Sequence, residues 1–495
     1  MKKKTAPVAH PPRLNGARVF GCRPGAPIQF RLAASGTGPL YFDVERLPRG
    51  LRLDARTGQL SGSLREPGRH TLAIRISGPG GHCDSAVVVH CGARIALTPP
   101  MGWNSWNCWA ASVSQEKVLT SATAMANLLL PHGWNSVNID DAWQGERSRR
   151  APYALQPNEK FPDMAGLADA IHGMGLRMGI YSTPWATSYA GFRGGSDDHP
   201  RGQSRLPACP DCWWERRAAF YHGLHSFAAA DARQWAAWGV DYLKYDWYPN
   251  DVASTRAMDE ALRASGRDIV LSLSNTLSFE GVFHTLPHAQ VWRTTGDIVD
   301  EWSRGSASHQ GFQGIADIIR HHAPYHVYQK PGHWNDPDML VLGQVGWGPN
   351  LHPTRLTQVE QLTHFATWCL WSAPLLIGCP LDRLDPFTLA LLTNDELIDL
   401  NQDACGVQAY PIQQSKDTLI LRKPLAGGSV AFGLLNFGES PREMTLDRKL
   451  AELLTGDYQL RDLVARQDLG ALGPRIGVDV EPHGIRVVRC TPTAA

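Results

Sequence analysis

Short apolar segments alternate with helical segments through the middle of the chain, and this alternation limits the possible folds more than any other feature. Eight strand-like segments are expected between about residues 99 and 403, separated by helical patterns. Such a repeat predicts a parallel sheet, and eight repeats predict a (β/α)8 barrel. The competing fold, an open doubly wound sheet, is disfavoured because no G-x-G-x-x-G motif follows the first strand. Strands are expected at 102–106, 134–139, 177–181, 240–245, 269–272 and 375–378, and helices at 118–129, 164–172, 227–238, 251–264 and 357–371.

Two β-rich regions flank the predicted barrel. In residues 1–96, β-rich runs alternate with turns that contain Pro and Gly, so we expect a small antiparallel sandwich. Residues 404–495 return to strand-like alternation and predict an antiparallel β-sandwich. The expected domains are therefore 1–96, 97–403 and 404–495, in line with about 150 residues per domain for a chain of 495 residues.

The charge balance narrows the class of partner. The chain has 48 Lys and Arg against 47 Asp and Glu, a net charge of +1. Near neutrality argues against nucleic acid or a membrane surface as a partner bound mainly through charge. There is no apolar run of about 18 residues, and the lysines at 2–4 are not followed by the apolar segment of a secretory signal. The compartment and the oligomeric state stay open.

Tryptophan is unusually frequent, with 17 residues against 14 Phe and 12 Tyr. An indole face can stack on a sugar ring while its N–H donates a hydrogen bond, although core packing explains such a count equally well. We expect tryptophans near strand ends to face a sugar and those on helices to pack in the core. The first group is Trp103, Trp106 and Trp185, and the second is Trp235, Trp238 and Trp371.

Polar and aromatic side chains gather where the predicted strands end, which is where (β/α)8 barrels carry their chemistry. A single Asp after a strand is often the N-cap of the next helix. Six strand ends with such residues are harder to explain this way, and because buried carboxylates are costly unless paired, they predict a hydroxyl-rich ligand. The set is Trp106, Asp140, Asp141, Tyr181, Lys244, Asp246, Arg293, Asp297 and the segment 334–338.

Two of these carboxylates, Asp246 and Asp297, suit glycoside hydrolysis, which needs one group at the anomeric carbon and another to protonate the leaving oxygen. Lys244 lies two residues before Asp246 and therefore points to the same face of the strand. We expect its positive charge to keep Asp246 ionised, as a nucleophile requires. Asp297 would then need a raised pKa to arrive protonated, and an ionised Asp246 nearby would raise it.

The strand-end motifs resemble those of glycoside hydrolase family 27, which contains α-galactosidases and α-N-acetylgalactosaminidases. The resemblance runs in order from about residue 98 to 405, and the N-terminal region lies outside it. It implies a catalytic barrel followed by a C-terminal β-sandwich and a retaining exo-glycosidase acting on terminal α-galactosides, with no cofactor and no metal. The motifs lie at 103–106, 139–143, 179–181, 243–247, 292–297 and 332–339.

The same resemblance implies a role for each strand-end residue. Asp246 matches the nucleophile and Asp297 the acid/base of a double displacement. The other matches are to sugar-binding positions: Asp140 and Asp141 for the axial O4 and the O6 of galactose, Lys244 and Arg293 as cations, and Trp106 and Tyr181 as aromatic walls.

The sequence departs from many relatives at the sugar 2-position. Ser274 and Asn275 stand where many α-galactosidases carry a Cys-Glu pair, and a slip of one residue would place Ser274 in the Glu position. Other activities of the family therefore stay open: α-N-acetylgalactosaminidase, β-L-arabinopyranosidase and isomalto-dextranase. The Asp140-Asp141 pair argues against the last because O4 of glucose is equatorial. A non-catalytic sugar-binding protein is the alternative from another class, and the presence of both Asp246 and Asp297 argues against it.

Four peripheral features complete the expectations. Residues 182–226 form a long segment after the third strand, and we expect it to shape the leaving-group subsites. The segment contains a possible zinc-binding spacing, formed by Cys209, Cys212, His222 and His225. The alternative for the two cysteines is free thiols or a disulfide within the loop. Cys83 and Cys91 are close enough in sequence to pair. Ala142 and Tyr248 replace disulfide cysteines of relatives, which leaves Cys108 without that partner. The segment 47–62 resembles the immunoglobulin-like modules of bacterial extracellular enzymes, which act as spacers or binding accessories.

Overall fold

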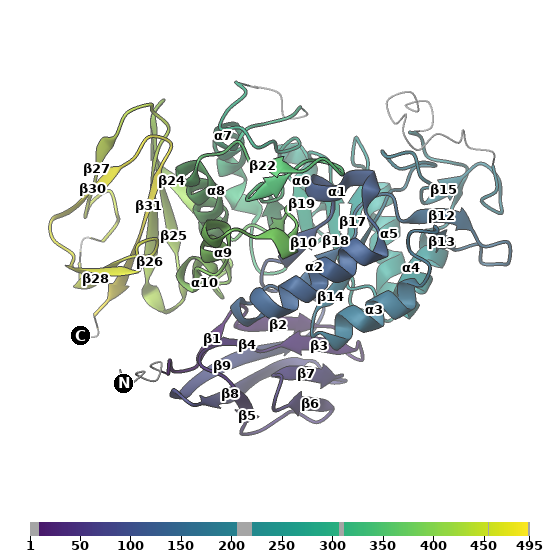
Figure 1. The fold of residues 1–495 in the computed structure, drawn as a ribbon, viewed down its shortest axis with the longest axis horizontal. Coiled ribbons are helices and arrows are strands. Elements are labelled where there is room, and N and C mark those ends of the chain that lie inside the picture. Colours follow the sequence, from purple (N-terminus) through teal and green to yellow (C-terminus); the bar gives the residue numbers. More distant parts are fainter. Residues whose placement is uncertain (1–8, 205–219, 306–310, 454, 494–495) are drawn as a thin grey trace, which may run out of the picture.

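Three β-containing regions follow one another along the chain in the computed structural model (Figure 1). The structure describes residues 9–204, 220–305, 311–453 and 455–493. The N-terminal strands lie below the central sheet in this view, and the C-terminal strands lie to one side of it. No helix in the described part of the chain is both long enough and apolar enough to span a membrane.

Eight parallel strands form the central sheet, in the order β20-β19-β18-β17-β14-β11-β10-β23. Leu340, which follows β20, forms a parallel bridge with Ile377 of β23, and its N–H donates to the Leu376 carbonyl at 2.8 Å. This bridge joins the two outer strands, so the sheet fits the predicted (β/α)8 barrel. The strands are β10 Met101–Asn104, β11 Ser136–Asn138, β14 Arg177–Ser182, β17 Tyr242–Asp246, β18 Val270–Ser274, β19 Val291–Arg293, β20 Trp334–Asp336 and β23 Leu375–Ile377.

The helices begin and end at residues whose chemistry suits a helix end. Ser114, Asp163, Asp251 and Thr357 each accept a backbone N–H of the first turn, and Gly239 ends α4 with a φ of 91°. The five predicted helices are confirmed to within a few residues. The helices are α1 Trp106–Trp109, α2 Gln115–Leu128, α3 Met164–Gly173, α4 Ala228–Trp238, α5 Val252–Ala264, α6 Phe279–Thr285, α7 Ile315–His322, α8 Gln358–Leu370, α9 Pro386–Leu392 and α10 Asp395–Asn401.

The C-terminal region is an antiparallel domain, as predicted. Its main sheet has the order β24-β25-β26-β31-β28-β29, and β27 pairs with β30. Alternate residues of β25 enter different cores: Leu421 joins the barrel core, whereas Ile420 joins the core of the C-terminal domain. The strands are β24 Tyr410–Gln414, β25 Thr418–Pro424, β26 Val430–Asn436, β27 Arg442–Asp447, β28 Tyr458–Asp462, β29 Gln467–Ala471, β30 Arg475–Val480 and β31 Ile485–Pro492.

The N-terminal region contains a four-stranded sheet, β2-β9-β8-β5, a three-stranded sheet, β3-β7-β6, and the pair β1-β4. The prediction of an antiparallel sandwich is wrong for one pair, because β2 runs parallel to β9. Cys83 and Cys91 are unpaired: both lie in β9, where eight residues of extended chain separate them by about 26 Å. The strands are β1 Arg13–Asn15, β2 Val19–Cys22, β3 Ile28–Arg31, β4 Ala33–Ser35, β5 Tyr41–Val44, β6 Leu51–Asp54, β7 Gln59–Gly62, β8 Gly68–Gly78 and β9 Gly81–Cys91.

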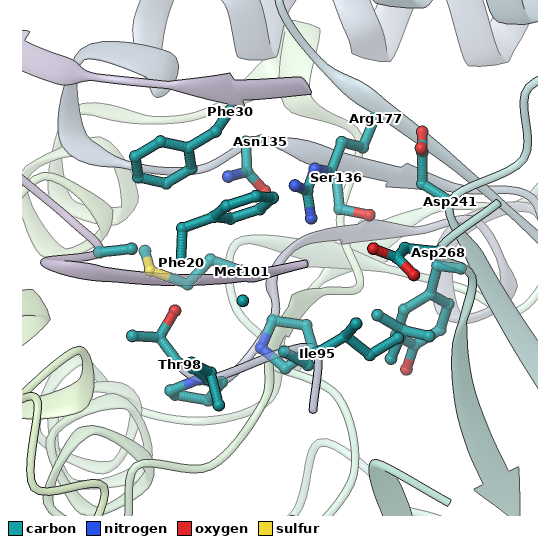
Figure 2. A pocket seen from close by; sticks show the side chains of 18 of the residues that line it. Phe20, Phe30, Ile95, Thr98, Met101, Asn135, Ser136, Arg177, Asp241 and Asp268 are labelled. Atoms are coloured by element: carbon teal, nitrogen blue, oxygen red, sulfur yellow. The ribbon is translucent and has the colours of Figure 1, made fainter. Parts of the chain in front are cut away.

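This N-terminal domain packs against the end of the barrel at which the strands begin. Arg23 forms an ion pair with Asp268, just before β18, and Arg177, the first residue of β14, donates to the Gln29 carbonyl at 2.8 Å. A cavity of about 90 Å³ lies between the N-terminal domain, which contributes Phe20 and Phe30, and the barrel, which contributes residues such as Arg177 and Asp241 (Figure 2). The domain therefore covers the end of the barrel opposite the predicted site.

Candidate active site

Asp246, the last residue of β17, is buried at the strand end. The side-chain amide of Asn275 donates to its Oδ1 at 2.6 Å. Asn275 follows β18 directly and has a φ of 61°, a left-handed conformation that Asn tolerates better than most residues. Ser274 is the strand partner of Asp246 across the β17–β18 ladder and is itself buried. Of the two candidates for the sugar 2-position, Asn275 is therefore the one whose side chain hydrogen-bonds Asp246.

The positive charge of Lys244 lowers the pKa of Asp246, which is the expected direction, but the effect of burial on this carboxyl is larger. Burial, together with the negative charges of Asp140 and Asp297, raises the pKa of Asp246 to about 7. Lys244 acts in the opposite direction, but its Nζ forms its ion pair with Asp140 Oδ2, at 2.8 Å. Burial alone would lower the pKa of Lys244, and the carboxylates of Asp140 and Asp246 reverse this and raise it. Lys244 thus stays charged, while its main partner is Asp140.

The two carboxylates after β11 are held in different ways. Asp140 Oδ2 accepts from Asn104 Nδ2 as well as from Lys244, both at 2.8 Å. Asp141 accepts from the backbone N–H of Ala142 at 2.7 Å and from that of Ala190 at 2.8 Å. Burial raises the pKa of Asp141, and these hydrogen bonds oppose the rise. Both carboxylates are therefore fixed in orientation before any ligand binds.

A second ion-pair group joins Arg293, the last residue of β19, to carboxylates that follow β19 and β20. Arg293 Nη2 lies 2.9 Å from Asp338 Oδ2 and 3.2 Å from Asp297 Oδ1. The two carboxylates differ in exposure, since the side chain of Asp297 is 61% exposed and that of Asp338 is 4% exposed. Burial alone would lower the pKa of Arg293, but Asp338 and Asp297 raise it, so the guanidinium stays charged. Asp297 is thus a solvent-facing carboxylate anchored beside a buried cation.

The aromatic residues predicted to face the sugar do not all do so in the structure. Tyr181 in β14 is buried; its hydroxyl makes no hydrogen bond of normal geometry to a described residue and lies close enough to Asp246 to lower the pKa of that carboxyl. Trp106 opens α1 and is half-buried. Trp103 does not face a sugar site: it is fully buried, and its Nε1 donates to the Cys379 carbonyl. Trp235 and Trp371 are buried in the core, as predicted.

Three further polar residues belong to this group although they were not singled out one by one. Asn104 holds Asp140, and Asp338 holds Arg293. Asp336 is buried near Arg293 and Lys244, and burial raises its pKa to about 6. All three stand in strand-end motifs, so their position was the available signal. Each lies beside residues that the sequence analysis did name: Asn104 beside Asp140, Asp338 beside Arg293, and Asp336 near Arg293 and Lys244.

The cysteine predictions have mixed outcomes. Cys108 is a free thiol, as expected from the replacements at 142 and 248. Cys209 and Cys212 lie outside the described residues, so the zinc, thiol and disulfide alternatives stay predictions. Within the described ranges, no group of three or more His, Cys, Asp and Glu side chains could hold a metal ion.

Comparison with known proteins identifies the family. A family model described as "Alpha galactosidase A" matches residues 98–202 and 212–403, and one described as "Alpha galactosidase C-terminal beta sandwich domain" matches residues 415–490. Alpha-galactosidase 2 of Arabidopsis thaliana is 32% identical over 405 residues, which cover 80% of this chain and 90% of the plant protein.

Solved structures agree. A Bacteroides fragilis protein superposes with a TM-score of 0.84 and 31% identity, covering 99% of this chain and 100% of its own, so the match includes the N-terminal domain. A family 27 β-L-arabinopyranosidase of Geobacillus stearothermophilus superposes with a TM-score of 0.67 and 26% identity, covering 81% of this chain and 98% of its own. This chain is a glycoside hydrolase and belongs to the alpha-galactosidase A family.

Proposed function

We propose that the chain hydrolyses terminal α-D-galactosyl residues with retention of configuration. Asp246 is the nucleophile and Asp297 the general acid/base. The environment of Asp246 carries this proposal: a buried carboxylate at the end of a barrel strand, fixed by Asn275 and influenced by the negative charge of Asp297. A buried carboxylate that ends β17 and a solvent-facing carboxylate that follows β19 are the kind of pair that double displacement uses.

In the first step, a carboxylate oxygen of Asp246 attacks the anomeric carbon. Because Asn275 donates to Oδ1, the attacking atom is Oδ2. The bond from the anomeric carbon to the leaving oxygen breaks, and Asp297 gives its proton to that oxygen. In the second step, Asp297 takes a proton from water, the water oxygen attacks the anomeric carbon, and the ester bond to Asp246 breaks. Two inversions at one carbon restore the original configuration.

The charged side chains that bind the sugar are already held by ion pairs or hydrogen bonds in the unliganded protein. Asp140 and Asp141 supply acceptor oxygens to the O4 and O6 hydroxyls, and Lys244 and Arg293 supply donors. An axial O4 distinguishes galactose from glucose, so we expect strong selection between these two sugars. Asn275 retains its side-chain oxygen as an acceptor for the hydroxyl at C2, because its amide nitrogen is used by Asp246.

Turnover of a nitrophenyl α-galactoside tests the proposal. Asp246→Ala should abolish hydrolysis, because no covalent intermediate can form, and Asp43→Ala, at an exposed aspartate of β5, is the matched control that should leave turnover unchanged. Unchanged turnover by Asp246→Ala would contradict the nucleophile assignment. A panel of α-galactoside, α-N-acetylgalactosaminide and β-L-arabinopyranoside separates the activities of the family, and faster turnover of either of the last two would replace α-galactoside as the substrate.

A further inference from the structure

Asp297, the carboxylate proposed as the acid/base, lies in an otherwise buried loop after β19. Its side chain is 61% exposed, whereas Gly296 before it and Ile298 after it are buried. Its carboxylate meets the buried Arg293 at 3.2 Å. A side chain this exposed takes its position largely from the backbone that carries it, so the contacts of the loop backbone decide where the carboxyl lies.

Gln313, a buried residue two positions before α7, contacts this backbone three times. Its side-chain Oε1 accepts the N–H of Gly296 at 2.9 Å. Its own N–H donates to the Asp297 carbonyl at 2.9 Å, and its carbonyl accepts the Val299 N–H at 3.0 Å. Gln313 is also the partner of Ile298 in a parallel bridge. One residue thus holds the backbone on both sides of Asp297.

The start of α7 fixes Gln313 in turn. Ile315, the first residue of the helix, donates its N–H to the Glu301 carbonyl at 2.9 Å. Gly314 lies so close to the loop that a Cβ at this position would come within 2.7 Å of the Cα of Ser303. The loop after β19 and the start of α7 therefore pack directly against each other, and Gln313 has a fixed place between them.

Only one of the three contacts uses the side chain of Gln313, and this is the bond to Gly296. A substitution can therefore remove this bond while the two backbone bonds remain. The buried Gly296 N–H would then lose its acceptor, which is unfavourable, so we expect the loop to shift and to carry Asp297 with it. A misplacement of about 1 Å can slow a reaction that depends on a positioned group by about a hundredfold.

We propose that Gln313 is a positioning residue for the general acid: through Gly296 it holds Asp297 where the carboxyl can protonate the leaving oxygen. This inference rests on the proposed function, in which Asp297 is the acid/base. Gln313 itself moves no proton and forms no bond to the sugar. Its loss should therefore impair proton donation and leave the attack of Asp246 on the anomeric carbon unaffected.

Two small substrates that share the galactose but differ in the basicity of the leaving group test this role. Methyl α-galactoside has an alkoxide leaving group, which is strongly basic and has to be protonated, whereas the fluoride of α-galactosyl fluoride leaves with little help from an acid. Both leaving groups are small, so contacts beyond the galactose do not enter the comparison. The quantity compared is kcat/KM, which reports the first, bond-breaking step of the double displacement.

Gln313→Met keeps the length of the side chain but lacks the acceptor oxygen. Its kcat/KM for methyl α-galactoside should fall at least about tenfold from that of the wild type. Its kcat/KM for α-galactosyl fluoride should stay within about twofold. Gln313→Glu restores an acceptor oxygen, and both of its values should lie within about twofold of the wild type.

Gln361→Met is the matched control. Gln361 is another buried glutamine whose Oε1 accepts a glycine N–H, that of Gly343 at 3.2 Å, in a loop that does not carry Asp297. Its substitution should change both kcat/KM values by the same factor. A fall in Gln361→Met as selective as that in Gln313→Met would overturn the proposal.

The remaining outcomes are distinct. Equal falls on both substrates in Gln313→Met, no fall on methyl α-galactoside, or a Gln313→Glu as impaired as Gln313→Met would overturn the positioning role. Turnover of the fluoride also reports the folded, active fraction of each variant, and Gln313→Asn, whose amide is one methylene shorter, repeats the test if Gln313→Met does not fold. Asp297→Ala should show the same selective fall, and a larger one. Equal falls in Asp297→Ala, or failure of the wild type to hydrolyse the fluoride, would overturn the proposed function itself.

Discussion

The buried carboxylate of Asp246 should destabilise the unliganded protein, and Asp246→Asn should relieve this cost. Burial raises the pKa of Asp246 from 3.8 to about 7. Because the folded state holds this proton more tightly than the unfolded state, stability is lost as the pH rises from about 4 and the full cost is present above about 7. A shift of about 3 units corresponds to about 4 kcal/mol at pH 8. Asparagine keeps the shape, and its oxygen can still accept from Asn275.

Calorimetry of both proteins from pH 5 to pH 8 measures this effect. Unfolding entropies of about 2.1 cal/mol/K per residue give about 1 kcal/mol/K for a chain of 495 residues, so Asp246→Asn should melt about 4 °C higher at pH 8. By the same linkage, the advantage should be about 2.5 kcal/mol smaller at pH 5. Asp43→Asn, at an exposed position, is the control. A Tm difference that does not grow with pH, or a less stable Asp246→Asn at pH 8, would refute the reasoning.

Three other outcomes follow from the same structure. The kcat/KM of wild-type enzyme for a nitrophenyl α-galactoside should fall about tenfold per pH unit below about pH 7, because Asp246, as the proposed nucleophile, has to be ionised; a flat pH–rate profile down to pH 5 would contradict this. Azide should restore hydrolysis of an activated galactoside by Asp297→Ala, and absence of rescue would leave the acid/base role without support. Arg23→Ala removes the ion pair with Asp268 and should destabilise the protein by about 1–3 kcal/mol while kcat/KM stays unchanged, since this contact lies at the other end of the barrel; thermal unfolding and kinetics check both halves.

Much of the fold could be predicted because local patterns decide it. The 3.6-residue periodicity predicted helices that the structure confirms, and the structure shows Ser114, Asp251 and Thr357 as N-caps of three of them. The parallel pairing of β2 with β9 could not be predicted, because it joins segments about 70 residues apart and alternation alone does not fix strand direction. The position of the N-terminal domain against the barrel depends on contacts such as Arg23 with Asp268, which no local pattern encodes.

A candidate site could be proposed from the sequence, but its electrostatics could not. The strand ends indicated where to expect the site, and the spacing of two predicted Lys244 and Asp246 on the same face of one strand. The sequence did not reveal that Lys244 pairs with Asp140, nor that burial outweighs its charge at Asp246. Trp103 was assigned to the sugar site because it lies near a strand end, yet it is part of the core. Burial depends on the whole packed barrel and not on a residue's neighbours in sequence.

The assignment of Asp246 as the nucleophile can be tested most directly by trapping the covalent intermediate. A slow galactosyl fluoride substrate that carries an additional fluorine on the sugar ring should accumulate the glycosyl-enzyme, and mass spectrometry of the digested protein should locate the sugar. We predict a single galactosyl ester on the carboxylate of Asp246, absent from Asp246→Asn. A turned-over substrate with no adduct, or an adduct on Asp297 or Asp140, would contradict the account.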